Sequence, residues 1–195
     1  MNATGELIAL ARTIGENVTV GLIGDRESGA DAVAMGADRV YVLSGQALRD
    51  GGRDAQLQAY ETLCKKTKAA AILLSKTDSS SELGPRLAAR MDVALAQDCT
   101  AIHLGADGGL TATRPVYGGN AVAKFSFPRD LTSIVILRAK SSEPKELDRT
   151  RSGEVIEMTP NIDPELLRVK SIKTIEEPAA GIRLEDATVV VSGGR

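Results

Sequence analysis

The chain is poor in aromatic side chains: it has no tryptophan, two phenylalanines and three tyrosines. Its core therefore has to be built from alanine, valine, leucine and isoleucine, as in α/β layers packed through small side chains. Two cysteines and one histidine are too few for a disulfide framework or a zinc site. We therefore expect no metal, and a reducing compartment, the cytoplasm.

An excess of charge of one sign is also missing. The 24 lysines and arginines are scattered among 26 acidic residues, for a net charge of −2, so the basic surface that nucleic-acid binding requires is lacking. No apolar run approaches the ~20 residues that cross a bilayer, and the first ten residues lack the pattern of a secretion signal. The sequence thus predicts a soluble protein that neither binds nucleic acid nor inserts into a membrane.

What is present is a globular composition, 43% hydrophobic and 26% charged over 195 residues, which suits one ordinary domain. Helical periodicity predicts a first helix over 5–14, with Thr4 as N-cap and Gly15 as its stop. A short buried strand (18–23), a helix (28–35) and a strand (39–43) follow. Strand, helix and strand in about 25 residues form a βαβ unit with parallel strands.

The same pattern then repeats. A helix is predicted over 54–67, and the apolar run 69–74 has no polar alternation, which is typical of a strand covered on both faces. We therefore expect that strand in the centre of the sheet. The hydroxyl-rich loop Ser75–Ser81 leads into a helix over 82–90. Such a loop, at the carboxyl end of a strand, either holds an anionic ligand or serves only as an N-cap.

Beyond residue 92 the period changes to that of strands. Strand-like segments with hairpin turns predict an antiparallel extension of the sheet, over 93–96, 100–104, 110–114, 120–127 and 131–137. After residue 140 the chain becomes polar and proline-rich, with short strands near 154–158 and 169–174, so that 141–187 is interpreted as an extended arm or linker. The last residues, 188–195, form a buried-type strand that ends at a glycine turn.

Polar residues with a possible role in binding gather between Cys99 and Pro144. Arg114 precedes a proline at a strand end, and the run Tyr117-Gly118-Gly119-Asn120 follows, whose glycines permit close approach by a ligand or a partner chain. The Arg114 guanidinium could contact a flavin or phosphate or clamp a carboxylate; equally, it could tie the hairpin to backbone carbonyls.

A catalytic set is not evident. The single histidine, His103, alternates with apolar residues in a strand, and four residues of strand place it about 13 Å from Cys99. Cys99 itself is interpreted as a small buried hydrophobe or a neighbour of a cofactor. Glu61, Glu82 and Asp98 form no carboxylate pair in the sequence pattern.

Five motifs in order resemble the N-terminal half of the alpha subunit of electron transfer flavoproteins. They are SELGPRLAAR at 81–90, QDCT at 97–100, TRPVYGGNA at 113–121, ILR at 136–138 and VVVSGGR at 189–195. The resemblance covers most of the chain. It implies a three-layer α/β domain with a mostly parallel, adenine-nucleotide-hydrolase-like sheet over 1–140, the antiparallel extension and the irregular C-terminal arm. Residues 188–195 would then be the first strand of a missing FAD domain.

The resemblance also implies a function. The chain would be a scaffold that docks a beta subunit and walls one side of a flavin site, without catalysis of its own, and FAD would belong to the full complex rather than to this chain alone. Electrons would come from an acyl-CoA or similar dehydrogenase, and bifurcation is a further option. The implied cofactor-binding residues are Arg114, Tyr117, Gly118, Asn120, Arg138 and Thr77, with Arg138 placed to stabilise a reduced flavin.

The start of the chain departs from the family, which opens with an apolar strand before its first helix. A central strand would therefore be absent or supplied by another segment, and we hypothesise that Thr188–Ser192 fills or borders that vacancy. Two other functions remain: a stand-alone module that binds AMP or ATP at Lys76–Ser81, and a purely structural interaction domain.

Overall fold

The computed structural model describes residues 2–169, 172 and 187–194. The helices are α1 (Asn2–Ile14), α2 (Arg26–Ala34), α3 (Gln46–Asp50), α4 (Gly52–Thr67), α5 (Asp78–Met91) and the short 3-10 helices η1 (Tyr117–Gly119) and η2 (Pro164–Leu166). The strands are β1 (Thr19–Ile23), β2 (Arg39–Leu43), β3 (Ala71–Ser75), β4 (Ala94–Cys99), β5 (Ala101–Leu104), β6 (Leu110–Val116), β7 (Ala121–Phe127), β8 (Ser133–Leu137) and β9 (Glu154–Met158).

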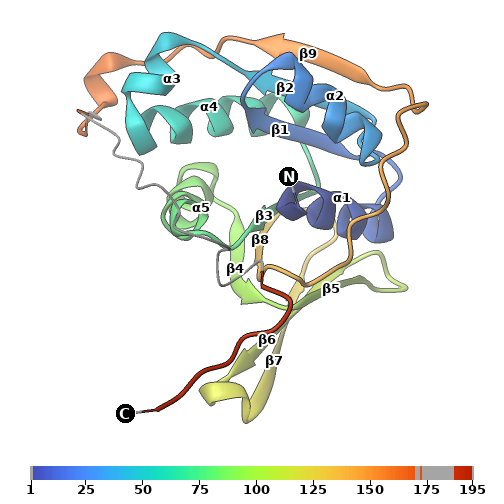
Figure 1. The fold of residues 1–195 in the computed structure, drawn as a ribbon. Helices are drawn as coiled ribbons and strands as arrows, with labels where there is room; N and C mark the ends of the chain where they lie inside the picture. The colour runs from blue at the N-terminus through green and yellow to red at the C-terminus, as the bar shows by residue number, and fades with distance from the viewer. Residues whose placement is uncertain (1, 170–171, 173–186, 195) are drawn as a thin grey trace.

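The strands form three sheets of three strands each (Figure 1). Sheet A has the order β1-β2-β9 and sheet B the order β3-β8-β4, and both are parallel throughout. Sheet C has the order β5-β6-β7 and is antiparallel. The predicted mostly parallel α/β fold with an antiparallel extension is therefore confirmed, with its parallel part divided in two. The strands expected at 93–96 and 131–137 do not belong to that extension, because they pair in parallel as β4 and β8 of sheet B.

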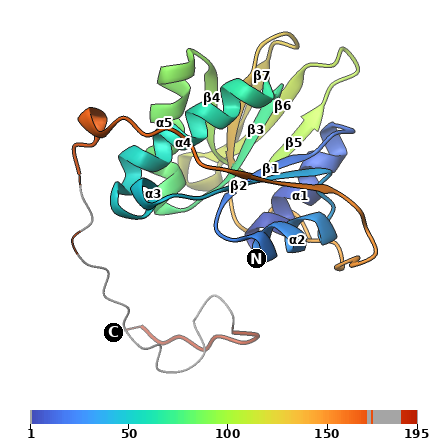
Figure 2. The same ribbon diagram turned by 90° about the horizontal axis from the view of Figure 1, so that it is seen from above.

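Helices cover both faces of the parallel sheets, which gives the three layers. Figure 2 shows α3, α4 and α5 on one side of the sheets and α1 and α2 on the other. Two helices each contact both parallel sheets: α4 packs Leu63 under sheet A and Leu57 under sheet B, and α1 packs Ile8 on sheet A and Leu10 against sheet B. Among the described residues no strand pairs with the second edge of β1 or β3, so α1 and α4 join the two sheets.

The centre of sheet B is β8, whose five residues are all buried. It pairs with β3 on one side and β4 on the other, while α5 and sheet C cover its two faces. Gly84 lets α5 pack closely on β8, because a Cβ at that position would lie 2.6 Å from Cδ1 of Ile136. Apolar burial on both faces and at both edges makes β8 the innermost strand of the sheet.

Several elements match the predicted ranges, and three expectations need correction. The helix α1 starts at Asn2, so Thr4 lies inside the helix and is not its N-cap. The strand β3 lies at an edge of sheet B and is half-buried throughout, because it pairs only with β8. The strand β1 is likewise an edge strand with exposed residues. The short helix α3 was not expected from the sequence.

The C-terminal apolar segment does not fill the vacancy in the sheet. Residues 187–194 form no strand, and Val189, Val190 and Val191 are 78%, 53% and 94% exposed. Figure 2 shows the segment apart from the layers. The hypothesis of a filling strand is therefore wrong for this structure, in which α1 and α4 already cover the sheet faces where the two sheets meet.

The predicted arm, 141–187, is partly built into the domain. Its strand β9 pairs in register with β2, and Val155 packs in the core of sheet A. Farther on, Gln58 of α4 exchanges two hydrogen bonds with the backbone of Asp163, at 2.8 and 3.2 Å. The strand predicted near 169–174 lies largely outside the described residues. The division of the chain at residue 140 remains a prediction. No helix among the described residues is long and apolar enough to span a membrane.

Candidate functional site

Three charged side chains meet where the parallel strands of sheet B end. Lys76 directly follows β3, Arg138 directly follows β8, and Asp98 lies near the end of β4. The carboxyl ends of parallel strands share one edge of the sheet, where ligands of open α/β folds bind. The carboxylate of Asp98 accepts hydrogen bonds from Nε and Nη2 of Arg138, at 2.9 and 2.8 Å, and from Nζ of Lys76.

A break in strand pairing places the Asp98 side chain between the two cations. The register of β4 against β8 shifts between Ala96 and Cys99, and Asp98 adopts a left-handed backbone with φ +62°. Asp and Asn tolerate this region better than most residues, and a bulge re-aims side chains at the end of a strand. The bulge therefore positions Asp98 as the shared counter-ion of Lys76 and Arg138.

The two cations hold Asp98 in its charged form. Hydrogen bonds from Arg138, then from Lys76, lower the pKa of the Asp98 carboxyl far below its usual range. A carboxyl with so low a pKa does not act as a general acid near neutral pH. Its role here is structural: it fixes the positions of both cations.

Next to this cluster lies a pocket of about 500 Å³. Its walls come from the end of β3, from α5, β4 and β8, and from the base of the β6–β7 hairpin. The lining residues are Lys76, Ser81, Leu95, Ala96, Gln97, Asp98, Arg114, Phe125 and Ile136. The lining of the pocket thus combines apolar side chains with charged ones, as that of small-molecule sites commonly does.

The two arginines predicted as cofactor-binding differ in their bonding. Both Nε and Nη2 of Arg138 are engaged by Asp98. In contrast, Nε of Arg114 is buried without a hydrogen-bond partner among the described residues, in which Arg114 makes no ion pair either. The alternative that Arg114 ties the hairpin to backbone carbonyls is therefore not what the structure shows. Arg114 is the guanidinium available to a ligand.

The start of α5 borders the same pocket and is ordered by its own hydroxyl groups. The hydroxyl of Thr77 accepts a hydrogen bond from the backbone N–H of Ser80, and the Ser80 hydroxyl accepts one from the N–H of Thr77, a complete capping box. Ser81 donates its hydroxyl to the Thr77 carbonyl at 2.7 Å. The N-cap interpretation of this loop therefore holds for Thr77, and a ligand role for Thr77 remains a prediction.

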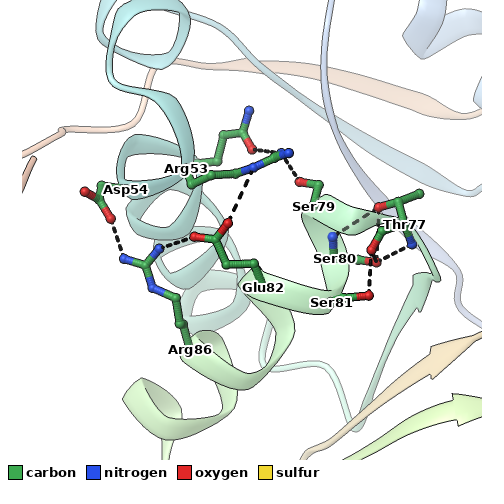
Figure 3. A network of polar contacts seen from close by, with 9 residues as sticks. Arg53, Asp54, Thr77, Ser79, Ser80, Ser81, Glu82 and Arg86 are labelled. Atoms are coloured by element: carbon green, nitrogen blue, oxygen red, sulfur yellow. Dashed lines mark hydrogen bonds and ion pairs between the residues drawn. The ribbon is translucent and has the colours of Figure 1, made fainter. Parts of the chain in front are cut away.

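A network of ion pairs fixes α5 against α4 (Figure 3). Arg86 of α5 binds Glu82 at 2.9 Å and the carboxylate of Asp54 on α4. Arg53 of α4 reaches across to the hydroxyl of Ser79 and lies 3.9 Å from Glu82. These contacts hold the first two turns of α5 in place, and with them the wall of the pocket that Ser81 provides.

The other predicted site residues lie at the tip of the β6–β7 hairpin, which projects from the layers (Figure 1). Tyr117 is 83% exposed and, like Gly118 and Gly119, has a positive φ. Asn120 closes the turn by donating from Nδ2 to the Tyr117 carbonyl at 2.9 Å. Three residues of strand, about 10 Å, separate Tyr117 from Arg114. The structure therefore places Arg114 in the lining of the pocket, Arg138 and Thr77 beside the pocket, and the other predicted residues at the hairpin tip.

Lys76 and Asp98 were not among the predicted cofactor-binding residues. Their positions in the sequence could have indicated them, because Lys76 and Asp98 both lie at the carboxyl ends of strands, as Arg138 does. Sequence separation hid it: Asp98 lies 22 residues from Lys76 and 40 from Arg138. Pairing over such distances depends on the order of the strands in the sheet.

No catalytic set comes together in the described part of the chain. Cys99 is fully buried in an apolar cluster, and burial raises the pKa of its thiol, as expected of a small hydrophobe. Glu61, Glu82 and Asp98 are each bound by lysine or arginine. No cluster of His, Cys, Asp and Glu within the described ranges could hold a metal.

Fold and site together define a three-layer α/β domain, with a pocket lined by charged residues at the strand ends and a projecting antiparallel hairpin. A model of the electron transfer flavoprotein domain matches residues 1–163. The chain therefore belongs to the electron transfer flavoprotein domain family.

Individual relatives agree with this assignment. The chain is 32% identical to the electron transfer flavoprotein subunit alpha of Thermoanaerobacterium thermosaccharolyticum, over all of this chain and 61% of that protein. It is 31% identical to the subunit alpha of Megasphaera elsdenii, over 98% of this chain and 57% of that protein. It is also 27% identical to the lactate dehydrogenase (NAD(+),ferredoxin) subunit LctC of Acetobacterium woodii, over 98% of this chain and 46% of that protein. The chain thus spans about half to three fifths of the length of these relatives.

Proposed function

We propose that this chain is the scaffold and subunit-docking part of an electron transfer flavoprotein alpha subunit. The proposal rests first on the family match over residues 1–163. It also rests on the hairpin, which exposes Tyr117 and 61% of Val122 on the projecting sheet C. An exposed aromatic and an aliphatic side chain on one projecting element are suited to the apolar centre of a protein interface. The partner is a beta subunit.

A flavin would meet this chain at the pocket. When bound in the complex, FAD supplies the one- and two-electron redox chemistry. The buried, unpartnered Nε of Arg114 fits an anionic part of such a cofactor, with Lys76 and Arg138 held nearby by Asp98. The chain would supply one wall of the site, carry out no catalysis of its own, and receive electrons through the complex from an acyl-CoA or similar dehydrogenase. Its free Cys64 and Cys99 fit a reducing compartment such as the cytoplasm.

Co-expression with the beta-type subunit of the same organism tests the docking role. We expect the chain alone to be colourless, and the pair to elute together with visible flavin absorbance. A double variant of the hairpin, Tyr117→Ser with Val122→Asp, should lose the complex. Leu147→Asp removes another exposed leucine, 49% accessible and outside the hairpin, and should retain it. Equal loss in both variants, or no complex with the unaltered chain, would contradict docking through the hairpin.

A further inference from the structure

The pocket beside Asp98 has an excess of positive charge that its own residues do not neutralise. Lys76 and Arg114 line the pocket together with one carboxylate, Asp98, and Arg138 binds that carboxylate from beside the pocket. Lys76 and Arg138 share that carboxylate, which leaves Arg114 without a counter-ion among the described residues. A buried guanidinium nitrogen without an acceptor is costly, which favours an anion beside Arg114.

The geometry favours an anion that can accept two hydrogen bonds from one guanidinium group. Arginine binds planar or tetrahedral oxyanions through two donors, which a lysine does not match. The hydroxyl of Ser81 lines the same pocket but donates its one hydrogen to the Thr77 carbonyl at 2.7 Å, so the donors that face an anion are those of Arg114 and Lys76. Lys76 adds a second cation on the rim, fixed in place by Asp98.

Apart from Gln97, the rest of the lining is apolar. Leu95, Phe125 and Ile136 form walls beside the charged rim, and a volume of about 500 Å³ is in the range that holds small molecules. A bare inorganic anion would leave these walls without contact. A ligand with an anionic end and a flat apolar body satisfies both parts of the pocket.

We propose that this pocket binds a phosphomonoester whose phosphate lies on Arg114 and Lys76 and whose apolar body packs on Phe125 and Leu95. A phosphomonoester carries close to two negative charges at neutral pH, which suits a phosphate placed between Arg114 and Lys76. The inference concerns the chain by itself: it shares Arg114 with the proposed flavin wall, but it requires no partner subunit.

Calorimetric titration of the full chain tests this with four probes: phenyl phosphate, inorganic phosphate, benzoate and phenol. We expect phenyl phosphate to bind most tightly, because it alone has both the dianion and the aromatic body. Arg114→Gln should weaken its binding about tenfold or more, the loss of a bidentate charge-assisted contact. Arg129→Gln makes the same change at an exposed arginine outside the pocket, and should leave the affinity unchanged.

Arg114→Lys is a second variant that distinguishes loss of the contact from a folding defect, because it keeps the positive charge and removes only the planar guanidinium. We expect its affinity for phenyl phosphate to lie between those of the unaltered chain and of Arg114→Gln. Three results would overturn the proposal: no binding of phenyl phosphate, equal affinity in Arg114→Gln, or benzoate bound as tightly as phenyl phosphate. The hairpin variant Tyr117→Ser with Val122→Asp should lose the beta subunit yet still bind phenyl phosphate, so failure of docking and failure of this site are told apart.

Discussion

Two apolar segments of similar sequence differ sharply in burial in this molecule. The strand β8 reads SIVIL, and the segment at 188–192 reads TVVVS. Every residue of β8 is buried, whereas Val189 and Val191 are 78% and 94% exposed. Sequence analysis predicted a strand for both segments.

The difference in burial comes from the elements that surround each segment. β8 has a paired strand on each edge, and α5 and sheet C on its faces, while residues 187–194 belong to none of the described sheets. Apolar sequence makes burial favourable, but burial happens only where other segments supply both backbone partners and side-chain cover. A single apolar run therefore does not reveal its place in a sheet.

Shortening a buried side chain of β8 should lower the free energy of unfolding more than any other change proposed below. Ile134 is fully buried between α4 and α5, so Ile134→Ala is expected to lower the free energy of unfolding by about 3 kcal/mol, through lost burial and the cavity left behind. Urea unfolding followed by circular dichroism measures this. A loss below about 1 kcal/mol would mean that β8 is not tightly packed.

The ion pair between α4 and α5, the helices that cover one face of β8, should contribute somewhat less to the stability of the fold. Asp54 of α4 is nearly buried, binds Arg86 of α5 and accepts the N–H of Arg168 at 2.8 Å. Asp54→Asn keeps the shape but removes the charge, and we expect a loss of about 2 kcal/mol. The exposed Asp50→Asn on α3, whose carboxylate accepts only from Gln46 among the described residues, is the control. Equal effects of the two changes would show that the ion pair between α4 and α5 does not secure the cover.

The ion pairs at the end of β8 should contribute less still. Asp98→Asn retains a residue that tolerates the left-handed backbone and removes the charge that binds Arg138 and Lys76. Both cations are nearly half exposed and so partly screened by water, which limits the expected loss to about 1 kcal/mol. Thermal unfolding against exposed Asp130→Asn measures the difference.

The effect of Asp98 should also depend on pH. Its pKa is lower in the folded chain than the value of about 3.9 expected when unfolded, so its stabilisation is fully present well above pH 4 and declines as the pH falls below that value. The unaltered chain and Asp98→Asn should therefore converge in stability in acid. A gap that stays constant down to pH 2 would contradict this role of the carboxylate.

The exposed segment should show the smallest effect. Val190→Ala removes two methyl groups from a side chain that is 53% exposed, and we expect a change within about 0.5 kcal/mol. The same urea unfolding measures it beside Ile134→Ala. A loss above about 1 kcal/mol would remove the contrast with β8, because it would require the segment to be packed against the domain.

Local patterns predicted the elements well. The strand β2 was predicted with its observed bounds, the βαβ unit has the expected parallel pairing, and the turn at Gly105–Gly109 joins antiparallel strands. These features depend on residues close together in the chain. The central position predicted for the run 69–74 was wrong, because an apolar run such as Ala71–Ser75 looks alike at the centre and at the edge of a sheet.

The site was predicted in part for the same reason. Arg114 was singled out by its position at a strand end and Arg138 by the family resemblance, but which arginine lacks a counter-ion among the described residues depended on Asp98. The bulge that places Asp98 arises from the pairing of β4 with β8, and that pairing joins segments about 40 residues apart. Charge neutralisation is a matter of distances in space, so the sequence left the two arginines equivalent.

By itself the sequence determined the alternation of helices and strands, the antiparallel extension and the absence of a catalytic histidine pair, because composition and periodicity are local properties. Only the tertiary structure decided that β8 is the buried centre, that α1 and α4 join two separate parallel sheets, and that Arg114 rather than Arg138 lacks a counter-ion within the described part of the chain. Each of these depends on contacts between distant segments, and such contacts are fixed by packing and pairing rather than by the residues of any one segment.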